Sequence, residues 1–513
     1  MPLRLISSYA TCVHAPPPSS SELAATQVSR RALLAVATAL TLELSTASAR
    51  AQPLPGRLGQ SVQPRLLELE RWAATNQAKL GAAVLDGADP GANGVALIAG
   101  SAPHVALNPA SNQKILTLVA ALEVLGPQHR FSTTLHGRGN GATLSELVLR
   151  SDGNPDFSTS DLAELVRRLS ARGAQHVTGD VWVDQSAFDT SWEPPAYEQR
   201  PDEWAAYRAP VSAVALDRNS VSLHVLATSS GDKARIWCEP PGLVEITGSV
   251  LTGPATSARN VRLSMLRAGN DRLRVSVGGS VPVGAPELSF SRRLHSPATA
   301  AGSTLYALLR AAGFRVDGRV RAGGAGIVAP LARIDSRPLS QLAPAAGKRS
   351  DNFHAEMFLK AVGAKASGAP GSSGAGARVI HDYMAALGAL DPGTRVSNGS
   401  GLYDANRVSA FGLARVLSAA ASNPRVAPDL LASLAIGGLD GTLAHRFAGL
   451  STARTVRAKT GTLAHVMALS GYVLRRNAAA PVSFAILLND VKQNHAQARQ
   501  RIDALVEAIA AAS

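Results

Sequence analysis

The 513-residue sequence is poor in cysteine and in aromatic side chains. It has two cysteines, Cys12 and Cys238, and only 4% of its residues are Phe, Trp or Tyr. Cys12 lies in an N-terminal segment that we expect to be removed, so no internal disulfide can stabilise the mature chain. The fold must therefore depend on its hydrophobic core, and Cys238 is most simply a buried or strand residue.

The sequence also lacks the patterns that hold metal ions. Its 12 histidines are dispersed, no H-E-x-x-H motif occurs, and no group of Cys and His has the spacing of metal ligands. We therefore expect neither a metal nor any other cofactor.

Lysine is scarce although the formal net charge is +14. Only eight of the 51 basic residues are lysines, and no arginine cluster is interleaved with aromatic residues. Scattered arginine is weak evidence for binding to nucleic acid. We expect a basic, soluble surface, no nucleic-acid partner, and at most a peripheral association with a membrane.

The first 51 residues have the layout of an export signal. The pair Arg30-Arg31 precedes an apolar stretch, and small residues follow at Ala49 and Ala51. The stretch is too short to span a bilayer and is interrupted by Glu43. We expect cleavage near Ala49 or Ala51. The arginine pair resembles a twin-arginine signal, and ordinary secretion or a retained anchor are the alternatives.

The length predicts two or three domains. The composition changes along the chain from mixed helix and strand to β-type runs broken by Gly, Pro, Asn and Asp, and then back again. We expect helices over 63–86, from Ser111 to Gly126, from about 338, and over 497–513. We expect strands over 94–100, 465–476 and 482–490, and β-type runs through 131–335. A turn between helices is expected at 368–378.

One tetrapeptide, S-N-Q-K at 111–114, points to chemistry. Positions i and i+3 share a helix face, so the Ser111 hydroxyl and the Lys114 amine can meet. Serine is a poor nucleophile unless a base takes its proton, and lysine can act as that base only if its pKa is lowered. The motif alone is weak, because S-x-x-K is common and a surface lysine would explain it.

Two further motifs make coincidence improbable. S-D-N stands at 350–352 and K-T-G at 459–461, in the order found in the serine acylases that include penicillin-binding proteins and β-lactamases. In this arrangement Ser111 attacks a carbonyl and Lys114 accepts its proton. Ser350 relays a proton to the leaving amine, and Asn352 orients the substrate amide and the lysine.

The third motif supplies charge and a strand edge. We expect Lys459 to lower the pKa of Lys114 and to attract a substrate carboxylate, to which the Thr460 hydroxyl donates a hydrogen bond. Gly461 would let a substrate backbone pass close to the strand. The backbone N–H groups of Ser111 and Thr462 would hold the oxyanion.

Nearly the whole mature chain resembles the class C low-molecular-mass penicillin-binding proteins, the D-alanyl-D-alanine carboxypeptidase/endopeptidase family. The resemblance rests on NPASNQKILT, ELVLRSDGNPDF, GDVWVDQSAF, YRAPVSAVALDRNSV, KRSDNFHAEMFLK, NGSGLYDANRVSA, GGLDGTLAHRF and AKTGTLAHVMALSGYV. It implies an α/β (α+β) fold in which a five-stranded antiparallel sheet, flanked by helices, is interrupted by one or two β-rich domains. The expected parts are 52–130 and 336–513 for the catalytic domain and 131–335 for the insertion.

The resemblance implies a periplasmic serine DD-peptidase that forms an acyl-enzyme on peptidoglycan stem peptides or cross-links and is acylated by β-lactams. The sequence leaves carboxypeptidase and endopeptidase activity both open, since they share one site and differ in the leaving amine. The family pattern D-G-S-G-L-S-R is altered here, with Asn398 in place of the acid and Tyr403-Asp404 in place of Ser-Arg. Substrate preference is therefore open, and Ser400 is interpreted as a turn residue.

Two other functions compete with this interpretation. A β-lactamase needs a deacylating base, but Glu356, the only acid directly after S-D-N, is better interpreted as structural. A non-catalytic wall-binding scaffold would not need all of the motif residues intact. An α/β-hydrolase is disfavoured, because no G-x-S-x-G motif occurs.

Overall fold

The computed structural model describes residues 57–87, 96–268, 272–323, 329–448, 453–475 and 480–513. The predicted export signal, 1–51, lies outside these residues. In the part of the chain that is described, no helix has the length and apolar character needed to cross a bilayer.

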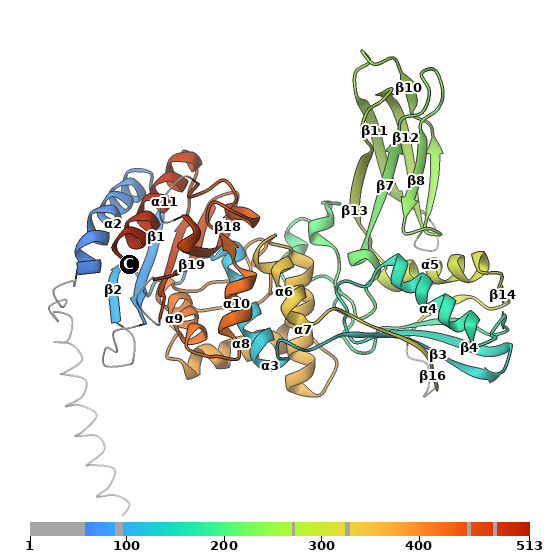
Figure 1. Cartoon of the computed structure of the whole chain (residues 1–513), viewed down its shortest axis with the longest axis horizontal. Helices are drawn as coiled ribbons and strands as arrows, with labels where there is room; N and C mark the ends of the chain where they lie inside the picture. Colours follow the sequence, from blue (N-terminus) through green and yellow to red (C-terminus); the bar gives the residue numbers. More distant parts are fainter. Residues whose placement is uncertain (1–56, 88–95, 269–271, 324–328, 449–452, 476–479) are drawn as a thin grey trace, which may run out of the picture. The chain divides into compact units, whose positions relative to one another are not determined.

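An antiparallel sheet with the strand order β17-β18-β19-β20-β1-β2 forms the centre of the first part of the fold (Figure 1). Its strands are β17 (Ala435–Ile436), β18 (Val456–Leu463), β19 (Val466–Val473), β20 (Val482–Asn489), β1 (Lys79–Asp86) and β2 (Ala96–Ser101). The predicted five-stranded sheet corresponds to the five longer strands. The two-residue β17 adds a short sixth strand beside β18.

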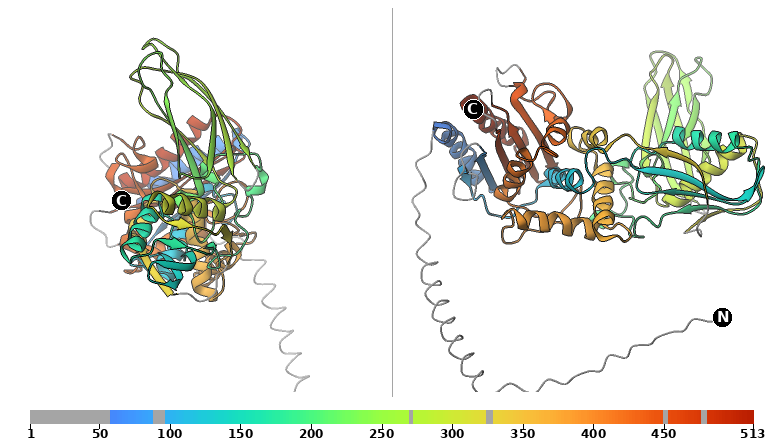
Figure 2. Two further views of the ribbon diagram at one scale, coloured as in Figure 1. Left: turned by 90° about the vertical axis from the view of Figure 1, so that its right-hand side faces the viewer. Right: turned by 60° about the horizontal axis from the view of Figure 1, so that its bottom comes forward.

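Helices cover both faces of this sheet (Figures 1 and 2). On one face lie α2 (Arg57–Thr75) and α11 (His495–Ala512), which pack against each other and against the strands. On the other face gather α3 (Gln113–Val124), α6 (Leu339–Gly347), α7 (Asn352–Ser367), α8 (Ser373–Ala386), α9 (Ala410–Ala421) and α10 (Ala427–Ser433).

Strand β20 shows why the sheet is buried on both faces. Alternate side chains of a strand point to opposite faces. Phe484 and Ile486 pack in the core with α2 and α11, whereas Ala485 and Leu487 pack in the core with α3 and α9. Every residue of β20 is buried, so its near-continuous apolar sequence follows from its central position.

Two predictions about this part were wrong in detail. Residues 79–86 were expected to continue the first helix, but they form β1, which pairs with both β2 and β20. A short apolar run does not distinguish a buried strand from a buried helix, and here the two pairing partners decide. The Gly/Ser stretch is a turn only over 368–372, because α8 already begins at Ser373.

The segment between α3 and α6 is rich in strands, as predicted. One sheet has the order β14-β5-β4-β3-β16, with β6 paired to β4 and β15, and helices α4 and α5 pack on it. Its elements are β3 (Ser132–Asn140), β4 (Thr143–Ser151), α4 (Thr159–Ala171), β5 (His176–Val177), β6 (Val181–Asp184), α5 (Pro297–Ala311), β14 (Arg315–Val316), β15 (Val320–Ala322) and β16 (Ala329–Asp335). The sequence interpretation missed α4, although its capping box at Ser158 and Asp161 is a start signal.

Two smaller sheets enclose a separate core within the same segment. They have the orders β13-β7-β8 and β10-β12-β11, with β9 paired to β12. The strands are β7 (Ser220–Leu226), β8 (Arg235–Glu239), β9 (Val244–Gly248), β10 (Leu251–Gly253), β11 (Asn260–Arg267), β12 (Leu273–Pro282) and β13 (Leu288–Arg293). Cys238, on β8, is partly buried, as expected for a strand residue.

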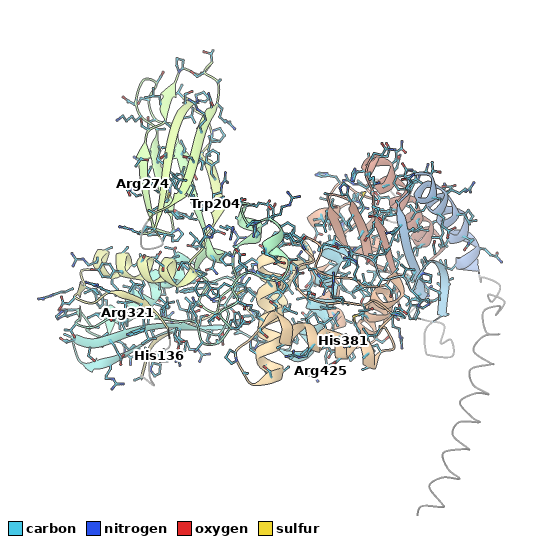
Figure 3. All side chains as sticks on the ribbon, turned by 180° about the vertical axis from the view of Figure 1, so that it is seen from behind. His136, Trp204, Arg274, Arg321, His381 and Arg425 are labelled. Carbon is cyan, nitrogen blue, oxygen red and sulfur yellow. The ribbon has the colours of Figure 1, made fainter. Side chains whose placement is uncertain are left out.

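The basic side chains labelled in Figure 3 come from different elements rather than from one cluster. Arg274 lies on β12, Arg321 on β15, and Arg425 just before α10. The first two form ion pairs, with Glu245 and Asp180 respectively. This spread agrees with a generally basic surface.

Truncating the central strand should weaken the fold strongly. Leu487→Ala would open a cavity at a site with 0% exposure, and we expect a loss of about 2–5 kcal/mol in the free energy of unfolding. Leu97→Ala, at a position on edge strand β2 that is 38% exposed, should cost less than about 1 kcal/mol. Urea unfolding of both variants measures the difference, and equal losses would contradict the central placement of β20.

Candidate active site

The candidate nucleophile lies in a tightly held turn before α3. Ser111 belongs to a short 3-10 helix, Ala110–Asn112, which leads directly into α3. Asn108 accepts a hydrogen bond from the Ala110 N–H at 2.9 Å. Asn489, at the end of β20, accepts from the Asn108 N–H and donates to its carbonyl, both at 2.9 Å. The sheet therefore holds the turn in place.

Two glycines allow this turn to pack. Ala110 has the left-handed φ of +45°, a conformation that costs free energy and persists only where the surroundings impose it. A Cβ on Gly401 would lie 1.8 Å from the Ala110 carbonyl oxygen, and one on Gly461 would lie 2.9 Å from the Pro109 carbonyl oxygen. We expected Gly461 to leave room for a substrate backbone. The structure adds a second reason for glycine here, because the nucleophile's turn fills the space where a Cβ would lie.

Lys114 is fully buried, with 0% exposure, and its ammonium group has three hydrogen-bond acceptors. Nζ donates to the Ser111 hydroxyl at 2.9 Å, to the Asn352 side-chain oxygen at 2.7 Å and to the Ser400 carbonyl at 2.7 Å. The contact between Ser111 and Lys114 that the i, i+3 spacing predicts is therefore present. In the described residues, no carboxylate forms an ion pair with Lys114.

Burial lowers the pKa of Lys114 from 10.5 to about 7, because the charged form loses its hydration. The negative charges of Glu356 and Asp351 oppose this and raise the pKa. We expected Lys459 to cause the lowering. Burial is the main cause, and repulsion between the two positive charges adds to it, since the pKa of Lys459 is likewise lowered by burial and by the Lys114 charge.

Lys459 is the second buried lysine of the site, also with 0% exposure. Its Nζ donates to the Ser350 hydroxyl at 2.8 Å and to the Thr460 carbonyl at 2.7 Å. Ser350 itself has a left-handed φ of +60°, so its turn is held in an uncommon conformation. The hydroxyls of Ser111 and Ser350 thus each accept a hydrogen bond from a buried lysine.

Asn352 is the first residue of α7 and connects the two motifs to the inserted segment. Its side-chain oxygen accepts from Lys114, and its amide donates to the Tyr207 carbonyl at 3.0 Å. Asp351 caps the helix by accepting from the His354 N–H at 3.1 Å. The S-D-N motif is therefore both a helix cap and a contact with the β-rich segment.

Strand β18 presents a free edge at this point. Leu463 pairs with Val466 across a two-residue turn, so the pairs of β18 and β19 alternate from there and the N–H groups of Thr460 and Thr462 point away from β19. On that side β17 reaches only as far as Ala458. The Thr462 N–H therefore lies on the exposed edge of the strand, where we expect it to hold an oxyanion together with the Ser111 N–H. The Thr460 hydroxyl donates to Thr442 at 2.9 Å.

The sequence interpretation missed two contributors, Thr442 and the Ser400 carbonyl, and gave a third residue, Glu356, a structural role. The Ser400 carbonyl holds Lys114, and the Thr442 hydroxyl meets Thr460. Glu356, with 0% exposure, accepts from the N–H groups of Gly399 and Ser400 at 3.0 and 2.8 Å, and its burial raises its pKa. No sequence pattern identifies a backbone carbonyl as a lysine partner, whereas G-T-L at 441–443 stands in a segment that carried the family resemblance.

The residues that depart from the family pattern organise the loop after Ser400. The Asn398 side-chain oxygen accepts from the Gly401 N–H at 2.9 Å, and its amide donates to the Pro195 carbonyl at 2.9 Å. Tyr403 donates to Glu203 at 2.6 Å. These contacts place the altered loop against the inserted segment and beside the site.

Three pockets are lined in part by residues of the second and third motifs or by the residue that follows them. One of about 750 Å³ includes Ser350 and Asn352 in its lining, and a second of about 1090 Å³ lies between Thr462 and the loop containing Tyr403. A third of about 400 Å³ lies beside Thr442 and Thr460 and is also lined by Arg446 and Arg499.

Residues 75–512 match the D-Ala-D-Ala carboxypeptidase 3 (S13) family, so the chain belongs to this family. Among its relatives is a D-alanyl-D-alanine carboxypeptidase of Actinomadura sp. strain R39, 33% identical over 391 residues, which are 72% of this chain and 71% of the relative. D-alanyl-D-alanine carboxypeptidase DacB of Haemophilus influenzae is 25% identical over 407 residues, or 78% of this chain and 84% of the relative.

The fold agrees with a solved structure. The crystal structure of penicillin binding protein 4 from H. influenzae has a TM-score of 0.69 to this chain, with 23% identity over 85% of this chain and 97% of that one. The same protein complexed with a β-lactam has a TM-score of 0.66. The predicted serine acylase fold is therefore confirmed.

A methyl group at Gly461 should disturb the nucleophile's turn. Gly461→Ala places Cβ near the Pro109 carbonyl and the Ala110 side chain, and we expect at least about a tenfold loss in turnover of a peptide ending in D-Ala-D-Ala. Gly374→Ala, in α8 where a Cβ meets nothing within 4 Å, should retain activity and raise stability by up to about 1 kcal/mol. Unchanged turnover in Gly461→Ala would contradict the tight contact.

Proposed function

We propose that this protein is a serine D-alanyl-D-alanine peptidase that forms an acyl-enzyme on Ser111. The observation that carries the proposal is the buried amine of Lys114, 2.9 Å from the Ser111 hydroxyl and with a pKa near 7. A base of this pKa can accept the serine proton at neutral pH. Membership of the S13 family supports the same reaction.

The first step is attack on the substrate carbonyl. The neutral Lys114 amine takes the proton of Ser111, whose oxygen forms a bond to the carbonyl carbon of the penultimate D-alanine. The negative charge that develops on the carbonyl oxygen is stabilised by the N–H groups of Ser111 and Thr462. Asn352 holds the lysine in position and offers its amide to the substrate backbone.

The second step breaks the carbon–nitrogen bond of the peptide. The leaving nitrogen needs a proton, and Ser350, whose hydroxyl accepts a hydrogen bond from Lys459, would relay it. The proton that Lys114 took from Ser111 passes through Ser350 to the nitrogen, the amine departs, and an ester of Ser111 remains. Water then attacks this ester, one proton of the water passes to the serine oxygen, and the acid is released.

Lys459 supports recognition of the substrate's carboxylate. It is a buried cation with no ion-pair partner in the described part of the chain, so an arriving carboxylate would compensate its charge. The hydroxyls of Thr460 and Thr442 lie beside it. The adjoining pocket of about 400 Å³, with Arg446 and Arg499, leaves room beyond one alanine. Both carboxypeptidase and endopeptidase activity are compatible with this site.

The substrate we propose is the peptidoglycan stem peptide or cross-link, with β-lactams as covalent inhibitors because their ring amide resembles the D-Ala-D-Ala amide. The complex of the H. influenzae relative with a β-lactam supports the inhibitor class. A wall substrate requires export, so residues 1–51 would be a cleaved signal and the mature protein would work in the periplasm. Residues 52–130 and 336–513 would form the catalytic domain around the insertion at 131–335.

Mass spectrometry tests the acyl-enzyme directly. After benzylpenicillin is added to the mature protein, we expect a single long-lived adduct that is absent from Ser111→Ala. Ser145→Ala is the matched control, since this exposed serine of β4 lies in the inserted segment and its hydroxyl donates to the Arg138 carbonyl. A short-lived adduct with rapid drug turnover would indicate a β-lactamase, and no adduct in the folded protein would leave a scaffold role.

The acylation rate should rise with pH through about 7, since only the neutral amine of Lys114 can accept the serine proton. Glu356→Gln removes a negative charge that raises this pKa, so the midpoint of the rise should move to lower pH. The maximal rate should also fall, because the two N–H groups bond separate carboxylate oxygens and one of them would face the glutamine NH2 group instead.

The pH dependence of acylation by a chromogenic cephalosporin measures both effects. Glu123→Gln is the control, because Glu123 lies near the far end of α3 and bonds Asn423 instead. A midpoint in Glu356→Gln at the same pH as in the unmodified protein would contradict the electrostatic contribution of Glu356.

A further inference from the structure

His354 occupies an unusual position for a histidine one turn after the S-D-N motif. Its side chain is 2% exposed and lies between two carboxylates. Nε2 is 2.9 Å from Asp156 Oδ1, and Nδ1 is 3.3 Å from Asp351 Oδ1. Asp156 belongs to the inserted segment, in the loop between β4 and α4, while Asp351 is the cap of α7.

Each carboxylate is also bonded to an arginine of the inserted segment or its end. Arg337, between β16 and α6, bonds Asp156. Arg218, which follows α4 and β6 in the chain, donates to Asp351 at 3.1 Å. The order Arg337, Asp156, His354, Asp351, Arg218 is therefore an unbroken chain of alternating charge. We call this chain of five residues the motif clamp.

The motif clamp acts next to two residues of the proposed machinery. Asp351 stands between Ser350 and Asn352, so a shift of its side chain or backbone moves both neighbours. Ser350 has a left-handed φ of +60°, and such a conformation is retained only while the surroundings hold it. Within the motif clamp, the inserted segment contacts this turn through Arg218 and Asp156.

The geometry favours the imidazolium form. A neutral imidazole has one ring nitrogen with a lone pair. With either tautomer, that lone pair would face a carboxylate oxygen, at 2.9 Å on one side or at 3.3 Å on the other. In the doubly protonated ring Nε2–H donates to Asp156, and the Nδ1–H group, which has no hydrogen-bond partner among the described residues, places positive charge 3.3 Å from Asp351.

The electrostatic surroundings agree. Burial lowers the pKa of His354, but the hydrogen bonds and charges of Asp156 and Asp351 outweigh it, so the pKa lies above its ordinary value. The hydrogen bond from His354 is the largest cause that holds the pKa of Asp156 well below its usual range. The other charged groups that line the adjoining pocket are Asp217, Arg218, Glu239 and Arg349.

We propose that His354 is a positioning residue for the acylation step: as an imidazolium it ties the S-D-N motif to the inserted segment, and its deprotonation frees the turn that carries Ser350 and Asn352. The proposal rests on the proposed acylation of Ser111. It assigns the β-rich insertion a direct part in catalysis, through Asp156, Arg218 and Arg337.

The direction of the pH effect follows from the raised pKa. The clamp is complete below the ordinary histidine value of about 6.5 and is lost as the pH rises through the higher value in the folded protein. Lys114 needs the opposite change, since it must lose its proton to act. The acylation rate should therefore rise with pH as Lys114 loses its proton and fall again as His354 loses its proton. The rate should reach its maximum between the pH values of these two deprotonations.

The test is the pH profile of the acylation rate constant with a chromogenic cephalosporin, resolved from the dissociation constant of the complex that precedes acylation. Asp156→Asn removes the charge that raises the pKa of His354, so the falling limb should move to lower pH. His354→Gln should lose the falling limb and acylate about tenfold more slowly at its maximum. Both losses should appear in the rate constant and leave the dissociation constant nearly unchanged.

Asp180→Asn is the matched control. It removes an ion pair with Arg321 on β15, in the inserted segment but without contact to His354, and its profile should equal that of the unmodified protein. If His354→Gln does not fold, Asp156→Asn still decides. A falling limb at the same pH in Asp156→Asn and in the unmodified protein would overturn the inference and leave the acylation proposal intact. No acylation in the unmodified protein would instead overturn the proposed function.

Discussion

The site depends on the burial of two lysines without ionic partners. Removing an ammonium group from water costs several kcal/mol unless charge or hydrogen bonds compensate it. Among the described residues, Lys114 and Lys459 have only neutral acceptors within hydrogen-bond distance: two serine hydroxyls, an amide oxygen and two carbonyls. The unfavourable burial lowers the pKa of both lysines, and at Lys114 this provides a base near neutral pH.

Packing in the surrounding fold offsets the free energy that the burial of the two lysines costs. The sheet is covered by apolar cores on both faces, and α3, which carries Lys114, is buried over most of its length. The acceptors come from separate elements: Asn352 begins α7, Ser400 lies in the loop before α9, and Thr460 lies on β18. Because each element is fixed by its own packing, the acceptors do not need to be ordered when a substrate arrives.

The inserted segment belongs to the site rather than standing apart from it. The Tyr207 carbonyl accepts from Asn352, Glu203 bonds the loop with the altered family pattern, and Asp156 bonds His354 on the helix that follows the S-D-N motif. Substitutions in the inserted segment that removed these contacts would shift Asn352. They would also change the walls of the two pockets of about 750 and 1090 Å³ that this segment lines. This link gives the long separation between the first and second motifs a structural role.

Much of the fold could be predicted because local patterns are strong where strands are bounded by turn residues. The β-type runs that became β4, β6, β7, β11 and β12 were predicted. Strand β1 was not, because its apolar run suits a helix equally well until its partners β2 and β20 are known. Helices α4 and α5 were missed within a stretch dominated by strands.

The sequence by itself determined the reacting groups: a serine and a lysine one helical turn apart, and two further motifs in a fixed order. Those follow from residue type and spacing alone. Only the tertiary structure decided why the pKa of Lys114 is low and that Thr442, Glu356 and the Ser400 carbonyl contribute contacts to the site. It also decided that the nucleophile's turn fills the space beside Gly461 and that His354 contacts Asp156. The reason is that burial and charge depend on distances between residues far apart in the chain, and no local pattern encodes those distances.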